Sequence, residues 1–257
     1  MKAILTVLGS GTSMGVPTIG CDCAVCCSSD PHDKRTRPSI MLEYGGKFVL
    51  IDSTPDFRQQ AIRENIRHLD AVFYTHTHAD HLLGIDDLRP LTFHHKPGKL
   101  PLYARPDAAE FIRNMFRYIF DANYKFGGLP RVDMKSIEGP VELFGAKFIP
   151  VPVIHGETEI IGFRFGSAAY LTDHSEIPES SYALMQGLDI LFLDALRYKP
   201  HPTHSTVENS LRIVERVKPQ RAFFTHNCHD LPHEATNASL PPNVRLSYDG
   251  MKLEFEI

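Results

Sequence analysis

Three histidines and one aspartate fall within the six residues from His76 to His81. The apolar run 69–74 precedes them and has the length and composition of a buried strand. His76 and His78 are two residues apart in extended chain, so their side chains point to the same side. Asp80 and His81, on the turn into a helix, can face the same point or a second metal. This stretch therefore predicts a metal site on the turn that leaves a buried strand.

Single ligand-type residues also follow other apolar segments of strand character. They are His155 after 141–154, Asp173 after the hairpin 160–171, Asp194 after 189–193, His226 after 221–225, and Asp52 at the end of the hairpin 39–52. Strand ends hold side chains rigidly at one edge of a sheet, so we expect these residues to gather near the 76–81 stretch. Four more histidines have weaker placement and stay outside the predicted site: His94, His95, His174 and His201.

Mixed imidazole and carboxylate ligands suit zinc, manganese or iron better than calcium, which prefers oxygen ligands alone. Seven ligands are too many for one tetrahedral ion: His76, His78, Asp80, His81, His155, Asp173 and His226. They would hold two divalent ions, zinc or manganese, if one carboxylate bridged them. Two ions about 3.5–4 Å apart can share a hydroxide and bind both oxygens of a phosphoryl displacement, so hydrolysis is the expected chemistry. Asp52 and Asp194 are better suited to orienting ligand imidazoles.

A second cluster, Cys21, Cys23 and Cys26, offers three thiolates in a C-x-C-x2-C spacing. Tetrahedral zinc needs a fourth ligand from elsewhere, and the candidates are Cys228 and His229, which follow His226 closely. We predict a structural zinc that ties the two loops together. Cys27 and Cys228 are then expected to be small buried thiols.

The glycine-rich stretch 9–17 lacks the Lys-Ser/Thr ending of a phosphate-binding P-loop. Its glycines are expected to let backbone pass close to other backbone or to a ligand. Helical periodicity predicts helices over 59–68, 107–122 and 207–217. The apolar stripe of the second helix is expected to be core and comprises Phe111, Met115, Phe116 and Phe120. His204, near the start of the third helix, is either a capping-loop residue or a group that meets an anion or donates a proton.

The chain has 257 residues, 42% of them hydrophobic, and we expect a single domain over 1–257 with a zinc-clip loop at about 20–30. A net charge of −4 provides no basic stripe for long nucleic acid and favours a small substrate. The apolar stretch within residues 1–9 is too short, and is interrupted too soon, to be the hydrophobic part of a signal sequence. No later run of 18 apolar residues is present that could span a membrane. We therefore expect a soluble cytoplasmic protein without a membrane partner. A homodimer is among the oligomeric states that the sequence allows.

The run from His76 to His81 matches the H-x-H-x-D-H motif, and the chain thereby resembles the metallo-β-lactamase superfamily. The resemblance implies an α/β (α+β) fold class, an αββα four-layer sandwich of two sheets with helices outside. It places His76, His78 and His155 on one ion, Asp80, His81 and His226 on the other, and Asp173 between them. Position 79 is Ala, whereas the redox-active di-iron branch of the superfamily tends to carry Glu there. Hydrolysis is therefore the expected reaction rather than oxygen chemistry.

Within that superfamily the chain is most similar to the phosphodiesterases of the carbon–phosphorus lyase pathway of phosphonate degradation. Three features carry the similarity: the cysteine cluster, the run 225–229 (Thr-His-Asn-Cys-His) and the loop 203–205 (Thr-His-Ser). The similarity implies that His229 is the fourth zinc ligand and that His204 is catalytic, together with Asp80. It also implies hydrolysis of small cyclic phosphodiesters, including nucleoside 2′,3′-cyclic phosphates and ribosyl cyclic phosphates.

Two other functions fit the same residues. One is a carboxylic ester, thioester or lactone hydrolase on the same fold. The other is a non-catalytic, metal-stabilised accessory protein similar to members that serve quinone-cofactor biosynthesis, although those tend to have eroded metal motifs. The tRNA 3′-processing nucleases of the superfamily would require an extended RNA-gripping arm, and the sequence has no basic insertion that could serve as one.

Overall fold

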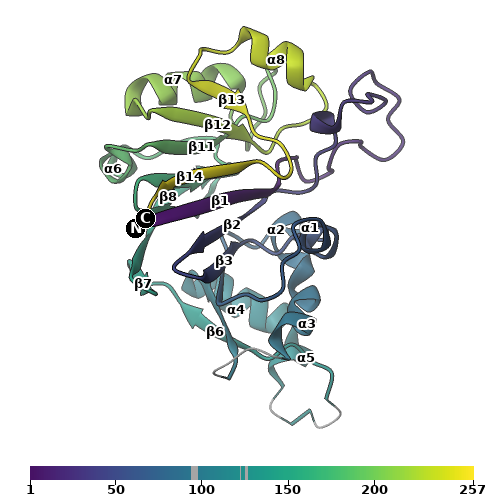
Figure 1. The fold of residues 1–257 in the computed structure, drawn as a ribbon, viewed down its shortest axis with the longest axis vertical. Helices are drawn as coiled ribbons and strands as arrows, with labels where there is room; N and C mark the ends of the chain where they lie inside the picture. The colour runs from purple at the N-terminus through teal and green to yellow at the C-terminus, as the bar shows by residue number, and fades with distance from the viewer. Residues whose placement is uncertain (94–97, 122, 125–126) are drawn as a thin grey trace.

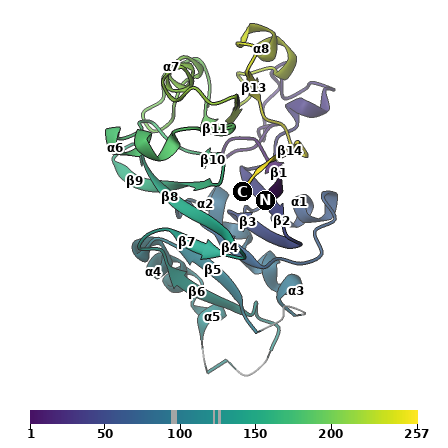
Figure 2. The same cartoon turned by 60° about the vertical axis from the view of Figure 1, so that its left-hand side comes forward.

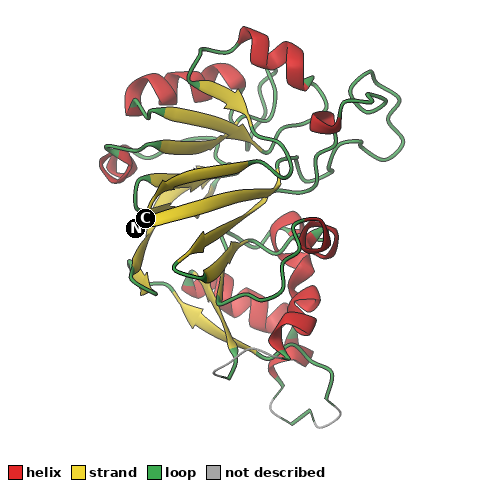
Figure 3. Ribbon diagram, viewed as in Figure 1, coloured by secondary structure: helices red, strands yellow, loops and turns green. Residues whose placement is uncertain are grey.

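The structure is a computed structural model that describes residues 1–93, 98–121, 123–124 and 127–257. His94, His95 and Ala122 lie outside the described residues. Within the described part, two sheets of seven strands each pack face to face, and helices cover their outer sides (Figures 1 and 3). This arrangement confirms the predicted αββα sandwich.

The first sheet contains, in spatial order, β14 (Lys252–Glu256), β1 (Lys2–Gly9), β2 (Ser39–Tyr44), β3 (Lys47–Ile51), β4 (Ala71–Phe73), β5 (Leu100–Ala104) and β6 (Val132–Ser136). β2 and β3 form the predicted hairpin, because Gly45 and Gly46 both adopt the positive φ angles that its two-residue turn requires. From β3 to β6 the pairing is parallel, so these strands end at a common edge.

The second sheet contains β13 (Val244–Leu246), β12 (Arg221–Thr225), β11 (Ile190–Asp194), β10 (Ala168–Leu171), β9 (Thr158–Phe165), β8 (Ala146–His155) and β7 (Val141–Leu143). β10 to β13 are parallel, whereas β7 to β10 form antiparallel hairpins. Figure 2 gives a second view of the two sheets and of the helices beside them. None of the described helices has the length and apolar character needed to cross a membrane.

The helices divide between the two outer faces. Beside the first sheet lie α1 (Phe57–Arg63), α2 (Ala79–Leu82), α3 (Arg89–Thr92), α4 (Pro106–Met115) and α5 (Arg117–Phe120); beside the second lie α6 (Glu179–Tyr182), α7 (Val207–Val217) and α8 (His233–Ser239). Three short 3₁₀ helices, Pro31–Asp33, Leu83–Leu88 and Ala183–Met185, complete the described elements. The prediction for α7 is confirmed over its whole length.

Two helix predictions were partly wrong. The expected helix 59–68 is α1, which ends at Arg63 because Asn65 adopts a left-handed conformation that Asn tolerates well. The expected helix 107–122 is divided into α4 and α5 at Phe116, whose φ of −109° and ψ of 43° are not helical.

The predicted apolar stripe on α4 was also wrong in part. Phe111 is 47% exposed and Met115 is 50% exposed, while Ala108, Ala109 and Ile112 are buried. Alanine side chains let a helix backbone approach a sheet closely, so the face that carries them packs inward. The larger side chains of Phe111 and Met115 are left on the outside of the helix.

The shared core lies between the two sheets and is rich in aromatic side chains. Phe73 on β4 stacks on Tyr103 at 4.8 Å and on Phe148 of the opposite sheet at 4.6 Å, and its ring meets the edge of Phe163 at 5.1 Å. Phe73, Phe148 and Phe163 are completely buried. These contacts join the sheets directly behind the strand that leads into His76.

Replacement of Phe73 by Ala is expected to destabilise the fold by about 3–5 kcal/mol, because it leaves a cavity among three aromatic rings. Urea unfolding measures this change. Phe144→Ala is the matched control, since Phe144 is 42% exposed and should lose no more than about 1 kcal/mol. Equal losses in the two variants would contradict the assignment of Phe73 to the shared core.

Candidate metal centre

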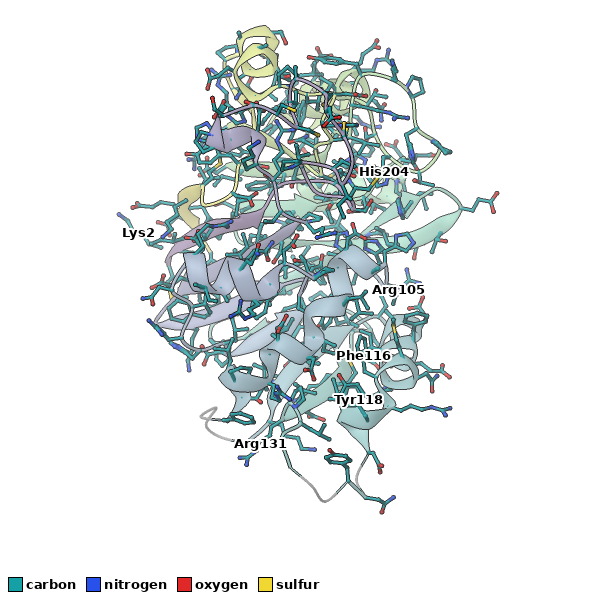
Figure 4. The ribbon with its side chains drawn as sticks, turned by 90° about the vertical axis from the view of Figure 1, so that its right-hand side faces the viewer. Lys2, Arg105, Phe116, Tyr118, Arg131 and His204 are labelled. Carbon is teal, nitrogen blue, oxygen red and sulfur yellow. The ribbon has the colours of Figure 1, made fainter. Side chains whose placement is uncertain are left out.

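The predicted ligands converge at the edge where the parallel strands end. His76 and His78 follow β4, His155 ends β8, Asp173 follows β10, and His226 follows β12. Asp80 and His81 lie on α2, the short helix after the His76–His78 turn. Figure 4 labels His204, which lies in the loop between β11 and α7.

Three of the residues after strands adopt the left-handed conformation, which non-glycine residues rarely occupy. The φ angles are 65° at Asp52, 57° at Asp173 and 58° at His226. Such a conformation ends the extended strand abruptly and redirects the side chain, at a cost of about 1–3 kcal/mol that the surrounding structure must offset. At this edge the conformation recurs at three strand ends, each of which carries a candidate ligand or an orienting carboxylate.

The first group of ligands comprises His76, His78 and His155, whose nearest nitrogens lie within 4.8 Å of one another. The His155 Nδ1–H donates to the carbonyl of Thr203 at 2.7 Å. The Thr75 hydroxyl donates to Asp52, so it accepts from the Nδ1–H of His76 at 3.0 Å. In His76 and His155, therefore, Nε2 is the nitrogen left free to bind an ion.

The second group comprises Asp80, His81, Asp173 and His226, all buried. His81 Nε2 lies 3.1 Å from Asp173 Oδ1 and 3.3 Å from Asp80 Oδ2. His226 Nε2 lies 3.2 Å from Asp173 Oδ2 and 3.4 Å from Asp80 Oδ2. The two carboxylates thus lie between the two imidazoles.

Asp52 orients this second group from behind. It accepts the Nδ1–H of His81 at 2.7 Å and the backbone N–H of Thr75 at 2.8 Å. Its completely buried carboxylate therefore fixes the ring of His81 and the start of the His76–His81 turn together. This contact is of the kind predicted for Asp52.

Asp173 connects the two groups. One of its oxygens, Oδ2, lies 3.2 Å from His226 Nε2 in the second group and 3.9 Å from His76 Nε2 in the first. A carboxylate in this position can contact two ions at once. The geometry is the one that the predicted bridging role of Asp173 requires.

The seven side chains fit two divalent cations. His76 Nε2 is buried without a hydrogen-bond partner, although its Nδ1 atom is bonded. A buried nitrogen without a partner is costly unless something binds it, and an ion at the first group would satisfy this atom. In the second group, His81 Nε2 faces the carboxylates of Asp173 and Asp80 at 3.1 and 3.3 Å. Imidazole and carboxylate are ligands that zinc and manganese accept.

Without ions, the buried charges of the second group compensate one another. Burial raises the pKa of Asp173, but His226 and His81 outweigh this effect and hold the pKa well below its usual range. Burial lowers the pKa of His226, but the carboxylates of Asp173 and Asp80 outweigh this effect and raise the pKa to about 9. The ion-free protein therefore carries imidazolium groups where cations would bind.

His204 lies beside both groups. Its Nδ1–H donates to Asp194 Oδ2 at 2.6 Å, its ring stacks on that of His226 at 4.5 Å, and the ring of His155 is 4.8 Å away. Burial and the positive charge of His226 lower the pKa of His204 to about 4. The prediction that Asp194 orients one of the seven ligand imidazoles is therefore wrong in its partner, because the imidazole that Asp194 contacts is that of His204.

The other histidines are outside these groups. His201 is close to His204, with ring centroids 5.1 Å apart, but it is partly exposed. His174 is completely buried next to Asp173, and neither of its ring nitrogens has a hydrogen-bond partner.

The cysteine clip has the four groups expected of a zinc site. Nδ1 of His229 lies 3.2 Å from Cys21 Sγ, 3.5 Å from Cys23 Sγ and 3.4 Å from Cys26 Sγ. Of the two candidates for the fourth position, it is thus His229 that meets the thiols. Cys228 is buried, as predicted, but the expectation for Cys27 was wrong because its side chain is exposed at the surface of the loop.

Arg35 attaches the clip loop to the strand end that carries His226. Its guanidinium is almost completely buried and donates to the carbonyls of Cys228 at 2.9 Å and Leu231 at 2.5 Å, and it pairs with Asp33 at 3.2 Å. Nothing in the sequence around Arg35 distinguished it from a surface arginine. The clip loop is the purple segment beside α8 in Figure 1.

The glycine-rich loop approaches the same strand end. The Asn227 N–H donates to the carbonyl of Ser10 at 3.0 Å, and the Thr12 N–H donates to the carbonyl of Asn227 at 3.2 Å. A Cβ at Gly9 would be 1.9 Å from the carbonyl oxygen of Arg37, so only glycine fits there. The predicted close approach of backbone to backbone is confirmed.

Residues 47–227 match the family model described as "Beta-lactamase superfamily domain". The chain belongs to the beta-lactamase superfamily. This membership confirms the family resemblance inferred from the His76–His81 motif.

Among solved structures, this superfamily member is 60% identical to a diphosphatase from the PhnP family, with a TM-score of 0.94 over 99% of this chain and 98% of that one. The Zn²⁺-bound PqqB from Methylobacterium extorquens shares the fold at 20% identity, with a TM-score of 0.80 over 97% and 99% of the two chains.

Two relatives found by sequence have names that describe neither a diphosphatase nor a phosphodiesterase. An octanoyltransferase of Porphyromonas gingivalis (strain ATCC BAA-308 / W83) is 38% identical over 257 residues, 98% of this chain and 51% of the relative. Our superfamily member thus spans about half of that relative's length. Coenzyme PQQ synthesis protein B of Methylorubrum extorquens (strain PA1) is 34% identical over 219 residues, 74% of this chain and 72% of the relative.

Metal uptake by the ion-free protein is expected to release protons, because His226 has a pKa of about 9 and only its neutral form binds an ion. The apparent affinity should therefore rise with pH from 7 to 9. Calorimetric titration with Mn²⁺ in buffers of different ionisation enthalpy measures the release. Mn²⁺ is chosen because it disfavours the thiolates of the clip. Uptake at pH 7 without proton release would contradict the charge arrangement described above.

Proposed function

We propose that the chain is a metal-dependent phosphodiesterase that hydrolyses small cyclic phosphodiesters, such as nucleoside 2′,3′-cyclic phosphates or ribosyl cyclic phosphates. The observation that carries the proposal is the position of Asp173 between two ligand groups, with the His204–Asp194 pair beside them. The 60% identity to a PhnP-family diphosphatase supports chemistry at phosphorus.

In the proposed enzyme, His76, His78 and His155 would hold one divalent cation, zinc or manganese, and Asp80, His81 and His226 the other, with Asp173 shared. Such a pair of cations supplies positive charge for the phosphate oxygens and activates water at neutral pH. The chain's own contribution is to fix the ligands: Asp52 holds His81, and the carbonyl of Thr203 holds His155.

We assign the movement of a proton to His204. Its Nδ1–H bond to Asp194 fixes the ring and leaves Nε2 as the functional nitrogen. The ring is neutral near pH 7 in the protein alone, since its pKa is about 4. An anionic phosphate beside Nε2 would favour the protonated form, which can hydrogen-bond a phosphate oxygen or donate to the leaving oxygen.

A second candidate within phosphorus chemistry is hydrolysis of a diphosphate, favoured by the name of the 60% identical structure. A third is hydrolysis of a carboxylic ester or thioester. The 38% identical octanoyltransferase favours it, although the chain covers only about half of that protein. All three reactions would use the same cations. Water would attack phosphorus in the two phosphate reactions and the carbonyl carbon in hydrolysis of an ester or thioester.

We further propose a cytoplasmic location, supported by four cysteines within seven residues that form no disulfide among the described residues. Long nucleic acid is not expected to be a substrate, given the net charge of −4.

The proposed activity is tested with adenosine 2′,3′-cyclic phosphate, a nucleoside diphosphate and an acyl thioester, each with the Mn²⁺- or Zn²⁺-loaded protein. His204→Ala should lower kcat on the cyclic phosphate by about a hundred-fold or more, since general acid–base groups contribute on that scale. Lys199→Ala is the control, because Lys199 is exposed in the same loop and should retain wild-type kcat. Faster turnover of the nucleoside diphosphate or of the thioester than of the cyclic phosphate would overturn the proposal.

Metal content separates the enzyme from the accessory-protein alternative, which the relative named Coenzyme PQQ synthesis protein B keeps open. We expect about three metal ions per chain, two at the dinuclear site and one zinc at the clip. Asp173→Asn should lose ions from the dinuclear site and retain the clip zinc. A wild-type content of about one ion, all zinc, would favour an accessory role. Elemental analysis of the purified chain measures this.

A further inference from the structure

A cavity of about 540 Å³ opens beside the first ligand group. It is lined by the segment from Thr75 to His78, by the segment from Gly156 to Ile160 and by the start of α4. Thr203, the neighbour of His204, completes the lining. The volume is in the range of pockets that hold ligands of nucleotide size, about 300–1,000 Å³.

Phe111 gives this cavity an aromatic wall. It lines the cavity with Asp107 and Ala108, its neighbours on one side of α4, and it is 47% exposed. The core does not need this ring, because the buried face of α4 is formed by Ala108, Ala109 and Ile112. An exposed phenyl ring at the wall of a cavity can stack on a flat apolar ring of a ligand.

The charges around the cavity indicate which part of a ligand lies near Phe111. Among the described lining residues, Arg105 is the one lysine or arginine, and it is already paired with Glu159 at 2.8 Å and Asp107 at 3.2 Å. Figure 4 shows Arg105 and His204 on the same face of the molecule. The lining has three carboxylates, those of Asp107, Glu157 and Glu159. The cavity near Phe111 therefore disfavours a second phosphate and suits hydroxyl and amino donors of a ligand.

We propose that Phe111 forms a stacking subsite for the nucleobase of the substrate, whose single phosphate lies at the ligand groups. The subsite rests on the proposed function and narrows it to nucleoside cyclic phosphates. The carboxylates of Asp107, Glu157 and Glu159 line the same cavity and can accept hydrogen bonds from the amino group of a base or from ribose hydroxyls. A ribosyl phosphate without a base would leave Phe111 unused.

The subsite is tested by selectivity. The kcat/KM of each variant is measured on adenosine 2′,3′-cyclic phosphate and on a methyl riboside 2,3-cyclic phosphate, which has the same ester and no base. The selectivity is the kcat/KM on the adenosine substrate divided by the kcat/KM on the methyl riboside. Phe111→Ala should lower this ratio about ten-fold, chiefly by raising KM for the adenosine substrate, since stacking of a base on an aromatic side chain is worth about that factor. Phe111→Trp should preserve the ratio.

Met115→Ala is the matched control, because Met115 is 50% exposed on the same helix and does not line the cavity. It should leave both rates at the wild-type value. An unchanged ratio in Phe111→Ala, or the same change in Met115→Ala, would overturn the subsite.

Failure of the proposed function would give a different result, because the wild type would then hydrolyse neither cyclic phosphate. In that case the subsite is judged by calorimetric binding of adenosine 3′-monophosphate and inorganic phosphate. Tighter binding of the nucleotide by the wild type, lost in Phe111→Ala, supports the subsite. Equal binding of the two ligands by the wild type overturns it.

Discussion

Six of the seven candidate ligand side chains, all except His78, are buried where the two sheets meet. Burying carboxylates and imidazoles away from water is costly unless each charge has a partner, and the strand ends must bring these partners together. The parallel strands of both sheets end at this edge, and the aromatic contacts of Phe73 and Phe148 hold the sheets in place behind it. The rest of the fold positions a group of charges that no single loop could stabilise.

The parts of this site that sequence could predict are those that local spacing determines. The run from His76 to His81 and the single ligands after apolar strands are local patterns, and the structure brings these residues together. The hairpin of β2 and β3 and the helix α7 were likewise predicted from short-range rules. Strands β5, β6, β13 and β14 were not predicted, because no histidine or aspartate of the predicted site follows any of them.

Other features depend on contacts between distant residues and could not be read from local patterns. Which of Cys228 and His229 meets the clip thiols is decided by how the loop after β12 turns. Arg35 acquires its role only through two carbonyls nearly two hundred residues away. Phe111 was misassigned because α4 has apolar residues around much of its circumference, and periodicity alone does not show which side faces a sheet.

His226 and His229 are three residues apart in the segment that follows β12, so one short stretch of backbone carries a residue of each candidate metal-binding group. Asn227 between them is bonded to the glycine-rich loop through Ser10 and Thr12. A shift of this backbone would therefore displace both imidazoles. If both groups hold metal, linkage requires that occupancy of each changes the affinity of the other by the same factor.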